Sequence, residues 1–228
     1  MRSTLTVRSA PFFLAALLLA LLTGLGAAPA ADAAPAPATT PSARVISTCT
    51  AFTGARALGA YYADAYVRVD SCGQRPSFDG ARNGSGPVVR PFVGSNIYYR
   101  GYQCIELVAR YLEVRFGAGP GVANGSQAVD RYVAAYPARF VKIANGTRGR
   151  APRKGDVLSL STTRYFNDVG HTGIVTSSRV NGRGRGTVRT VEQNWGGTGG
   201  DRGYHDYRVR NWRVVSPSMP HVKWLRAR

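Results

Sequence analysis

The sequence predicts an α+β fold in which helices come first and an antiparallel β-sheet follows. Two observations lead to this prediction. Between residues 103 and 136, apolar residues recur three and four positions apart, which is the spacing of one buried helix face. After residue 150, apolar and polar residues alternate in short runs between glycine-rich turns, a pattern typical of antiparallel strands. The 228 residues show no internal repeat, and we expect one folded domain over residues 45–228.

The N-terminal residues 1–33 are expected to be a signal peptide. Arg2 and Arg8 place positive charge ahead of an apolar run over residues 12–22, which is too short to span a bilayer. Two Ala-x-Ala motifs around residue 30 offer cleavage sites, and the alternative is an uncleaved membrane anchor. The pattern therefore predicts a secreted protein, with a disordered linker following over residues 34–44.

Two helices are predicted in the first half of the folded region. The first spans residues 103–116, and it places Glu106 and Arg110 four positions apart on its exposed face. The second spans residues 126–136, where Ser126 can cap the start and a proline follows the end.

The remaining segments are assigned from turn-forming residues and from alternation. Residues 45–72 give mixed signals, and residues 77–101 are rich in Gly, Asn and Pro, so they are expected to form a long loop. Four strands are predicted, over residues 156–160, 171–178, 187–193 and about 204–215.

Three cysteines are informative because the chain is predicted to enter an oxidising compartment. Cys49 and Cys72 can form a disulfide that closes a loop of about two dozen residues. Cys104 is then left without a partner, at the point where a glycine-bearing loop turns into the first helix. An odd cysteine in a secreted protein is a working thiol, an intermolecular partner or a buried structural residue. A position at the start of a helix favours the thiolate form of a nucleophile.

The groups that could activate this thiol lie in the predicted sheet. His171 opens a strand, and Glu192 and Asn194 are two apart on the neighbouring strand, so they share one face. We expect Cys104 to act as nucleophile and His171 as base, with Glu192 or Asn194 fixing the imidazole tautomer. Taken singly, each of these residues also fits a structural role in an edge or a turn.

Other chemistries fit the sequence less well. It has no G-x-S-x-G motif for a serine hydrolase and no H-E-x-x-H motif for a zinc protease. Its three histidines are scattered and are not accompanied by a cluster of carboxylates. The sequence therefore predicts neither a metal nor another cofactor.

The formal net charge is +18, and arginines account for most of it. A surface of this charge attracts polyanions. Anionic polymers of a bacterial cell wall or an anionic membrane are favoured for an exported protein, and no specific nucleic acid is expected. The alternative is that the charge only keeps the protein soluble.

Four segments together resemble a known family. They are residues 102–111, 152–160, 170–175 and 191–195. Their order, spacing and element types resemble the CHAP family, the cysteine-, histidine-dependent amidohydrolase/peptidase domains, over about residues 85–215. The resemblance implies a papain-like fold with the N-terminal helices packed on the C-terminal sheet. It also implies that Cys104, His171, Glu192 and Asn194 form the catalytic site.

The activity implied by the resemblance is hydrolysis of amide bonds in peptidoglycan. The bond would join muramic acid to L-alanine, or lie within the peptide stem or its cross-bridges. Gln103 or one of the nearby tyrosines, Tyr102 among them, could assist the backbone in holding the oxyanion, and Trp195 could line the cleft. Some family members bind calcium just before the cysteine, but residues 96–103 contain no carboxylate, so none is expected here.

We expect a monomeric, cell-wall-associated enzyme. The alternatives are a catalytically silent basic domain that binds anionic wall polymers, and a thioester acyl transferase.

Overall fold

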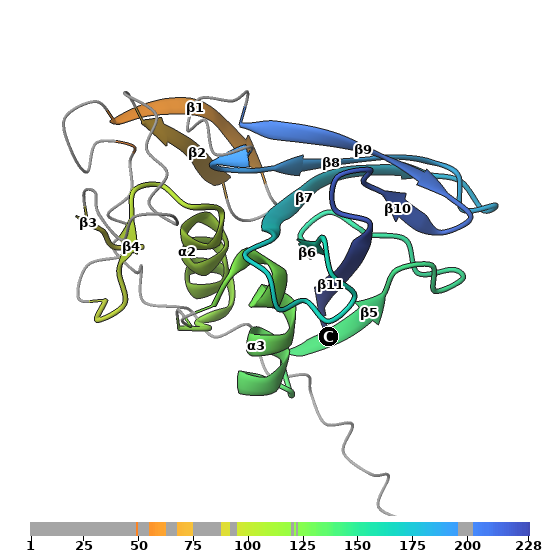
Figure 1. Cartoon of the computed structure of the whole chain (residues 1–228), viewed down its shortest axis with the longest axis horizontal. Helices are drawn as coiled ribbons and strands as arrows, with labels where there is room; N and C mark the ends of the chain where they lie inside the picture. The colour runs from red at the N-terminus through yellow and green to blue at the C-terminus, as the bar shows by residue number, and fades with distance from the viewer. Residues whose placement is uncertain are drawn as a thin grey trace, which may run out of the picture. The chain divides into compact units, whose positions relative to one another are not determined.

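The structure is a computed structural model of the chain, shown in Figure 1. It describes residues 49, 55–62, 68–74, 88–91, 95–119, 121, 123–195 and 203–228. The chain divides into two units, residues 1–38 and 39–228, and every described residue lies in the second. The predicted signal peptide and linker therefore fall outside the described residues. Within the described part, no helix is both long and apolar enough to cross a membrane.

Two small antiparallel pairs of strands precede the helices. The first pair is β1 (Ala55–Tyr62) with β2 (Arg68–Gln74), and the second is β3 (Val88–Val89) with β4 (Tyr99–Arg100). The helical elements are α2 (Cys104–Phe116), the 3-10 turn η1 (Gly125–Gln127) and α3 (Ala128–Ala135). The prediction that helices come first is therefore incomplete, because residues 45–72 and part of the expected loop over residues 77–101 contain strands.

Seven strands form the main sheet, in the order β10-β9-β8-β7-β6-β11-β5, and every neighbouring pair is antiparallel. The strands are β5 (Phe140–Ala144), β6 (Val157–Ser161), β7 (His171–Val180), β8 (Gly186–Val191), β9 (Tyr204–Arg210), β10 (Arg213–Val215) and β11 (His221–Ala227). The predicted α+β class and antiparallel sheet are confirmed.

The four predicted strands correspond to β6, β7, β8 and, as one segment, β9 with β10, whereas β5 and β11 were missed. The strand expected over residues 204–215 is divided by a turn at Asn211 and Trp212, whose φ angles are 49° and 66°. Two successive residues with positive φ form the tight hairpin turn that suits the twist of antiparallel strands. The segment is thus two strands, β9 and the edge strand β10.

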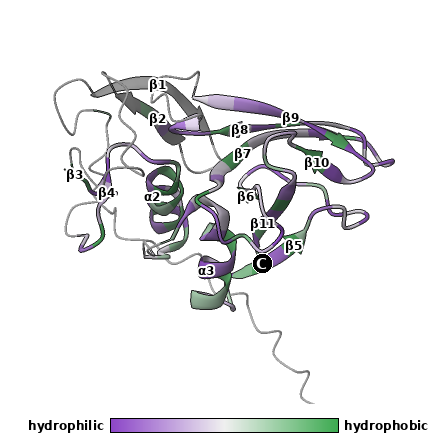
Figure 2. Cartoon of the chain, in the orientation of Figure 1, coloured by the Kyte–Doolittle hydropathy of each residue, from purple (hydrophilic) through white to green (hydrophobic). Residues whose placement is uncertain are grey.

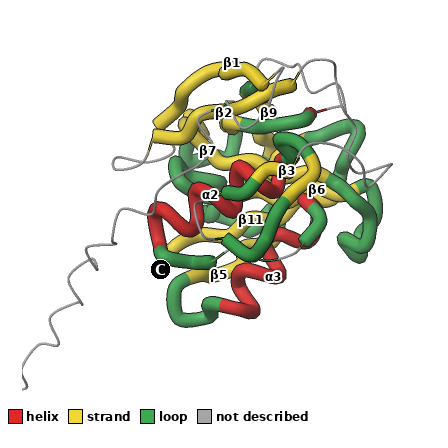
Figure 3. The backbone as a smooth tube through the Cα atoms, turned by 90° about the vertical axis from the view of Figure 1, so that its left-hand side faces the viewer, coloured by secondary structure: helices red, strands yellow, loops and turns green. Residues whose placement is uncertain are grey.

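The sheet separates two apolar clusters, one on each face. Side chains of α2 and α3 pack with residues of β5, β6, β7, β8 and β11 in the first cluster, which includes Leu107, Tyr132 and Ile174. Figures 1 and 3 show both helices beside these strands. The second cluster joins residues of all seven strands on the opposite face, with Trp224 fully buried in it. Along the strands, hydrophobic residues (green) and hydrophilic residues (purple) follow one another in Figure 2.

Helix α2 is covered on more than one side. Glu106 is 0% exposed and Arg110 is 2% exposed, so the prediction that they lie on an exposed face is wrong. The physical reason is that β2 packs against this side of the helix, where Arg110 Nη2 donates to the backbone oxygen of Asp70 at 3.0 Å. Helix periodicity had indicated one buried face, and a distant segment of the chain covers the second.

The predicted second helix begins with η1, and Ser126 does not cap it. The Ser126 hydroxyl instead donates to the backbone oxygens of Phe166 and Asp168, in the loop that leads into β7. Ser159 of β6 takes the capping role, because its Oγ accepts from the Val129 amide at 3.1 Å and donates to the Gly125 oxygen at 2.8 Å. These contacts fix η1 against the start of β7.

Gly125→Ala tests how tightly η1 holds the start of β7. A Cβ at residue 125 would lie 2.7 Å from the carbonyl carbon and 2.8 Å from Cα of His171, and backbone atoms yield little. We expect the free energy of unfolding to fall by about 1–3 kcal/mol in a denaturant titration. Gly121→Ala is the matched control because its Cβ would meet no atom within 4 Å. Equal stability of the two variants would contradict this packing.

Candidate active site

Cys104 is the first residue of α2 and carries a free thiol. The other two cysteines, Cys49 and Cys72, form the predicted disulfide, with their Cα atoms 5.1 Å apart. The side chain of Cys104 is largely buried, and residue 104 as a whole is 8% exposed. As the first helical residue it also presents a backbone N–H that no carbonyl within the helix can accept.

His171 lies between this thiol and a carboxylate. Its Nε2 is 3.0 Å from Oε2 of Glu192, and the side chain of Cys104 interacts with the same ring and raises its pKa. Because Glu192 occupies Nε2, Nδ1 is the ring nitrogen left available to the thiol. His171 is 3% exposed and Glu192 is 2% exposed, so water scarcely screens this pair. The structure thus brings together the three residues for which the sequence predicted a nucleophile, a base and an orienting group.

The Glu192 carboxylate is held by two hydroxyl groups besides the imidazole. Thr190 Oγ1 donates to Glu192 Oε1 at 2.6 Å, and the Tyr207 hydroxyl donates to the same oxygen at 2.9 Å. Gly173 lies beneath the side chain, where an added Cβ would be 2.8 Å from Glu192 Cγ. The sequence analysis missed Tyr207. The only signal for it is its place among the inward-facing residues of β9.

Burial and neighbouring charges shift the pKa values of His171 and Glu192 in opposite directions. Burial by itself lowers the pKa of His171, but the Glu192 carboxylate and the Cys104 side chain outweigh it and raise the pKa above the usual 6.5. Burial by itself raises the pKa of Glu192, but His171, Thr190 and Tyr207 lower it below the usual 4.5. At neutral pH the stable form of the pair is therefore imidazolium with carboxylate.

Tyr207 stays a neutral donor beside the pair. Burial and the adjacent Glu192 carboxylate both raise the pKa of Tyr207 well above 10. Its hydroxyl therefore remains protonated throughout the range in which the protein is expected to work.

Asn194 has a different position from the one predicted. Its Nδ2 donates to Oε1 of Gln103 at 2.8 Å, and Gln103 Nε2 donates in turn to the Arg100 oxygen at 2.8 Å. Glu192, and not Asn194, makes the bond to His171 that orients the imidazole. Asn194 Oδ1 is buried and has no hydrogen-bond partner among the described residues. Asn194 thus contacts the residue that precedes the nucleophile.

The other two predicted site residues differ in their surroundings. Tyr102 is 1% exposed and belongs to a buried cluster with Cys49, Cys72 and Val89, so its ring is turned into the protein. Trp195 is half-buried, and its indole meets the His171 imidazole edge to face, with ring centroids 4.5 Å apart. Trp195 therefore shields the base, and Tyr102 belongs to the support of the helix.

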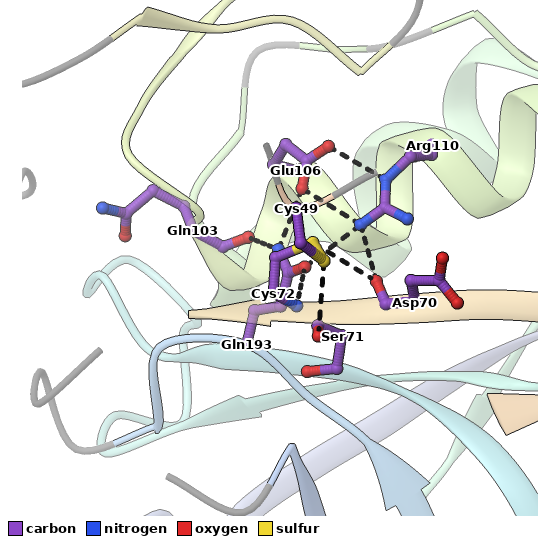
Figure 4. Close-up of polar contacts among 8 residues, drawn as sticks. All are labelled: Cys49, Asp70, Ser71, Cys72, Gln103, Glu106, Arg110 and Gln193. Carbon is purple, nitrogen blue, oxygen red and sulfur yellow. Dashed lines mark hydrogen bonds and ion pairs between the residues drawn. A yellow bond between two sulfur atoms is a disulfide. The ribbon is translucent and has the colours of Figure 1, made fainter. Parts of the chain in front are cut away.

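Figure 4 shows a second buried polar network, which involves Gln103 and Gln193, the chain neighbours of Cys104 and Glu192. Arg110 Nε pairs with Glu106 Oε1 at 3.0 Å, and Arg110 Nη2 donates to Gln193 Oε1 at 3.0 Å. Gln193 Nε2 donates to Glu106 Oε2 at 2.9 Å and to the backbone oxygen of Gln103 at 3.0 Å. Gln193 follows Glu192, and Gln103 precedes Cys104, so this amide ties the two catalytic segments together.

The disulfide-linked hairpin completes this network. The Cys72 amide donates to Gln193 Oε1 at 2.9 Å, and Ser71 Oγ donates to the backbone oxygen of Glu192 at 2.5 Å. Sequence reasoning missed Ser71, Arg110 and Gln193 as supports of the site. One sequence feature indicates part of this network, namely the i, i+4 spacing of Glu106 and Arg110 on the helix that carries Cys104.

Comparison with known protein families gives a match over the region that carries these residues. Residues 93–194 match the family model of the CHAP domain. The match is consistent with a CHAP domain over these residues. The matched segment runs from ahead of Cys104 to Asn194, so it includes all four predicted catalytic residues and leaves out the β1–β2 hairpin and strands β9 to β11. No curated protein matches the chain.

Glu192→Gln tests the electrostatics of this site through the pH dependence of stability. The raised pKa of His171 means that its contribution is fully present below pH 6.5 and is lost as the pH rises through the raised value. The lowered pKa of Glu192 means that its contribution is present above pH 4.5 and is lost as the pH falls through the lowered value. We therefore expect the free energy of unfolding of the variant to fall by about 3–5 kcal/mol between pH 4.5 and pH 6.5, where both contributions are fully present. The loss should be smaller at lower and at higher pH.

Denaturant titrations from pH 3 to pH 10 measure this difference. Asp206→Asn is the control, because Asp206 forms an exposed pair with Arg189 and should contribute under about 1 kcal/mol. A loss in Glu192→Gln that stays constant over pH, or grows toward pH 10, would argue against an imidazolium–carboxylate pair.

Proposed function

We propose that the protein is a secreted peptidoglycan hydrolase that cleaves amide bonds with Cys104 as the nucleophile. A CHAP domain implies amidase or peptidase activity of the peptidoglycan-hydrolase type in general. The observation that carries the finer proposal is the buried His171 imidazole, which contacts Glu192 through Nε2 and whose pKa is raised by both Glu192 and the Cys104 side chain. A purely structural histidine would not require a free thiol and a buried carboxylate in contact with it at the same time.

The first half of the reaction forms a thioester. In the starting pair the proton of the Cys104 thiol already lies on Nδ1 of His171, and Glu192 stabilises this imidazolium. The Cys104 sulfur attacks the amide carbonyl carbon, and the carbonyl oxygen becomes an oxyanion. The imidazolium then donates its Nδ1 proton to the amide nitrogen. The C–N bond breaks, the amine leaves and the acyl group stays on sulfur.

The second half releases the acyl group to water. His171 takes a proton from a water molecule as its oxygen attacks the thioester carbonyl. The C–S bond breaks, the carboxylic acid leaves, and the proton on His171 restores the starting pair. The backbone N–H of Cys104, which has no acceptor within the helix, is our candidate for holding the oxyanion in both halves.

The supporting residues have roles in this proposal as well. Asn194 fixes the Gln103 side chain at 2.8 Å and so holds the peptide that precedes the nucleophile. Trp195 covers one edge of the imidazole and keeps water away from it. Helices α2 and α3 packed against the sheet support the papain-like arrangement that the motifs implied.

The bond cleaved is either the one between muramic acid and L-alanine or one in the peptide stem or its cross-bridges. Export is proposed from the N-terminal sequence, in which a basic start precedes a short apolar run and small-residue cleavage motifs. A protein exported in this way meets peptidoglycan outside the membrane.

Cys104→Ala and His171→Ala test the proposal directly. We expect each to lower the release of soluble fragments from purified peptidoglycan by about 10³-fold or more, because nucleophile and base act as a unit. His221→Ala is the matched control, since His221 begins β11 and is not among the residues that contact Cys104 or Glu192. Mass spectrometry of the fragments identifies the bond broken. Full activity in Cys104→Ala would refute the mechanism, and fragments joined to an added amine would indicate an acyl transferase.

A further inference from the structure

Strands β8 and β9 form an open hollow well away from the catalytic residues. It has a volume of about 520 Å³ and is lined by Arg185, Gly186, Thr187, Arg208, Val209, Arg210 and Asn211, and we call it the arginine pocket. Gly186 begins β8 and Glu192 follows its end. At about 3.3 Å per residue these positions are roughly 20 Å apart, so the arginine pocket is separate from the active site.

The arginine pocket collects positive charge without neutralising it. Arg185, Arg208 and Arg210 are all exposed, none forms an ion pair within the described part of the chain, and no carboxylate lines the hollow. The neighbouring Arg189 is different, because Asp206 holds it through contacts of 2.8 and 2.6 Å. Asp206 therefore neutralises Arg189, whereas the three arginines of the pocket lie together without a carboxylate partner among the described residues.

Strand register explains how these side chains converge. Arg208 and Arg210 are two apart on β9, so they project from the same face. Thr187 lies opposite Arg208 on one side and opposite Arg179 of β7 on the other. The hydroxyl of Thr187 and the amide of Asn211 add neutral donors to the guanidinium groups. The result is a set of donors with no acidic group among them.

We propose that the arginine pocket is a second binding site, which takes the phosphate groups of a phosphodiester polymer that carries no bases. A guanidinium group presents paired N–H donors that match two oxygens of one phosphate. The net charge of +18 draws a polyanion toward the protein from a distance. Three unpaired arginines in one hollow then provide a place where successive phosphates are held.

The lining also distinguishes among polyanions. Binding of single-stranded nucleic acid depends on aromatic side chains on which bases stack, and no aromatic residue lines the arginine pocket. Insertion into a lipid surface requires exposed apolar side chains, and Val209, the apolar residue of the lining, is 1% exposed. A polymer of phosphates joined by small polar units needs neither aromatic stacking nor apolar contacts, so it matches this lining.

The test compares two variants of equal charge in the full chain. One changes Arg185, Arg208 and Arg210 to Gln, and the control changes Arg131, Arg148 and Arg150, which are also exposed, to Gln. The probe is poly(glycerol phosphate) of defined length, titrated calorimetrically at 150 mM salt. We expect the pocket variant to bind about 10-fold or more weakly, with a salt slope lower by about two to three, and the control to change less than threefold.

Both variants must unfold at the temperature of the parent protein, and single Arg208→Gln replaces the triple variant if they do not. Equal weakening of pocket and control variants would overturn the proposal in favour of diffuse attraction, and so would binding that neither variant weakens. Single-stranded DNA and vesicles of anionic phospholipid are tested in parallel, and tighter binding of either than of poly(glycerol phosphate) would also overturn it. The result is independent of the hydrolase proposal, since Cys104→Ala should still bind the polymer and the pocket variant should still cleave peptidoglycan that lacks it.

Discussion

The buried pair of His171 and Glu192 is the interaction on which the catalytic arrangement depends. The carboxylate is 2% exposed, so it would be unstable as a charge without the imidazole at 3.0 Å and the hydroxyl groups of Thr190 and Tyr207. In return it keeps the proton on the imidazole and leaves Nδ1 available to Cys104. The contact between His171 and Glu192 therefore sets the charge, the protonation and the orientation of the imidazole. The remaining requirement is that the Cys104 thiol lies beside the other ring nitrogen.

The position of the Cys104 thiol depends on the β1–β2 hairpin, which lies outside the matched residues 93–194. Helix α2 carries Cys104, and its buried pair of Glu106 and Arg110 would be costly to desolvate without further partners. Gln193 and the backbone oxygen of Asp70 supply those partners, and the Cys72 amide bonds to Gln193 in turn. The disulfide-linked hairpin thus closes a chain of contacts that runs from the nucleophile helix to the segment that carries Glu192. We infer that this hairpin fixes the distance between thiol and imidazole.

The sequence was sufficient for the elements whose signals are local. The stripe of apolar residues after Cys104 predicted α2, and alternation predicted β6, β7 and β8 close to their observed limits. It was insufficient where a distant segment decides the outcome. Glu106 and Arg110 have the spacing of an exposed pair, and only the packing of β2 buries them. Glu192 and Asn194 were expected on one face of a strand, but β8 ends at Val191 and Asn194 has a φ of 53°, so the backbone turns and the two side chains diverge.

The most direct measurement of the central claim is the titration of the His171 ring by ¹⁵N NMR in the native protein, with the signal assigned by its loss in His171→Gln. The account predicts that both ring nitrogens of His171 stay protonated at neutral pH and lose a proton only well above pH 6.5, because Glu192 stabilises the imidazolium in a buried site. A ring that titrates at or below pH 6.5, as burial alone would dictate, would contradict the pairing from which the proposed chemistry follows.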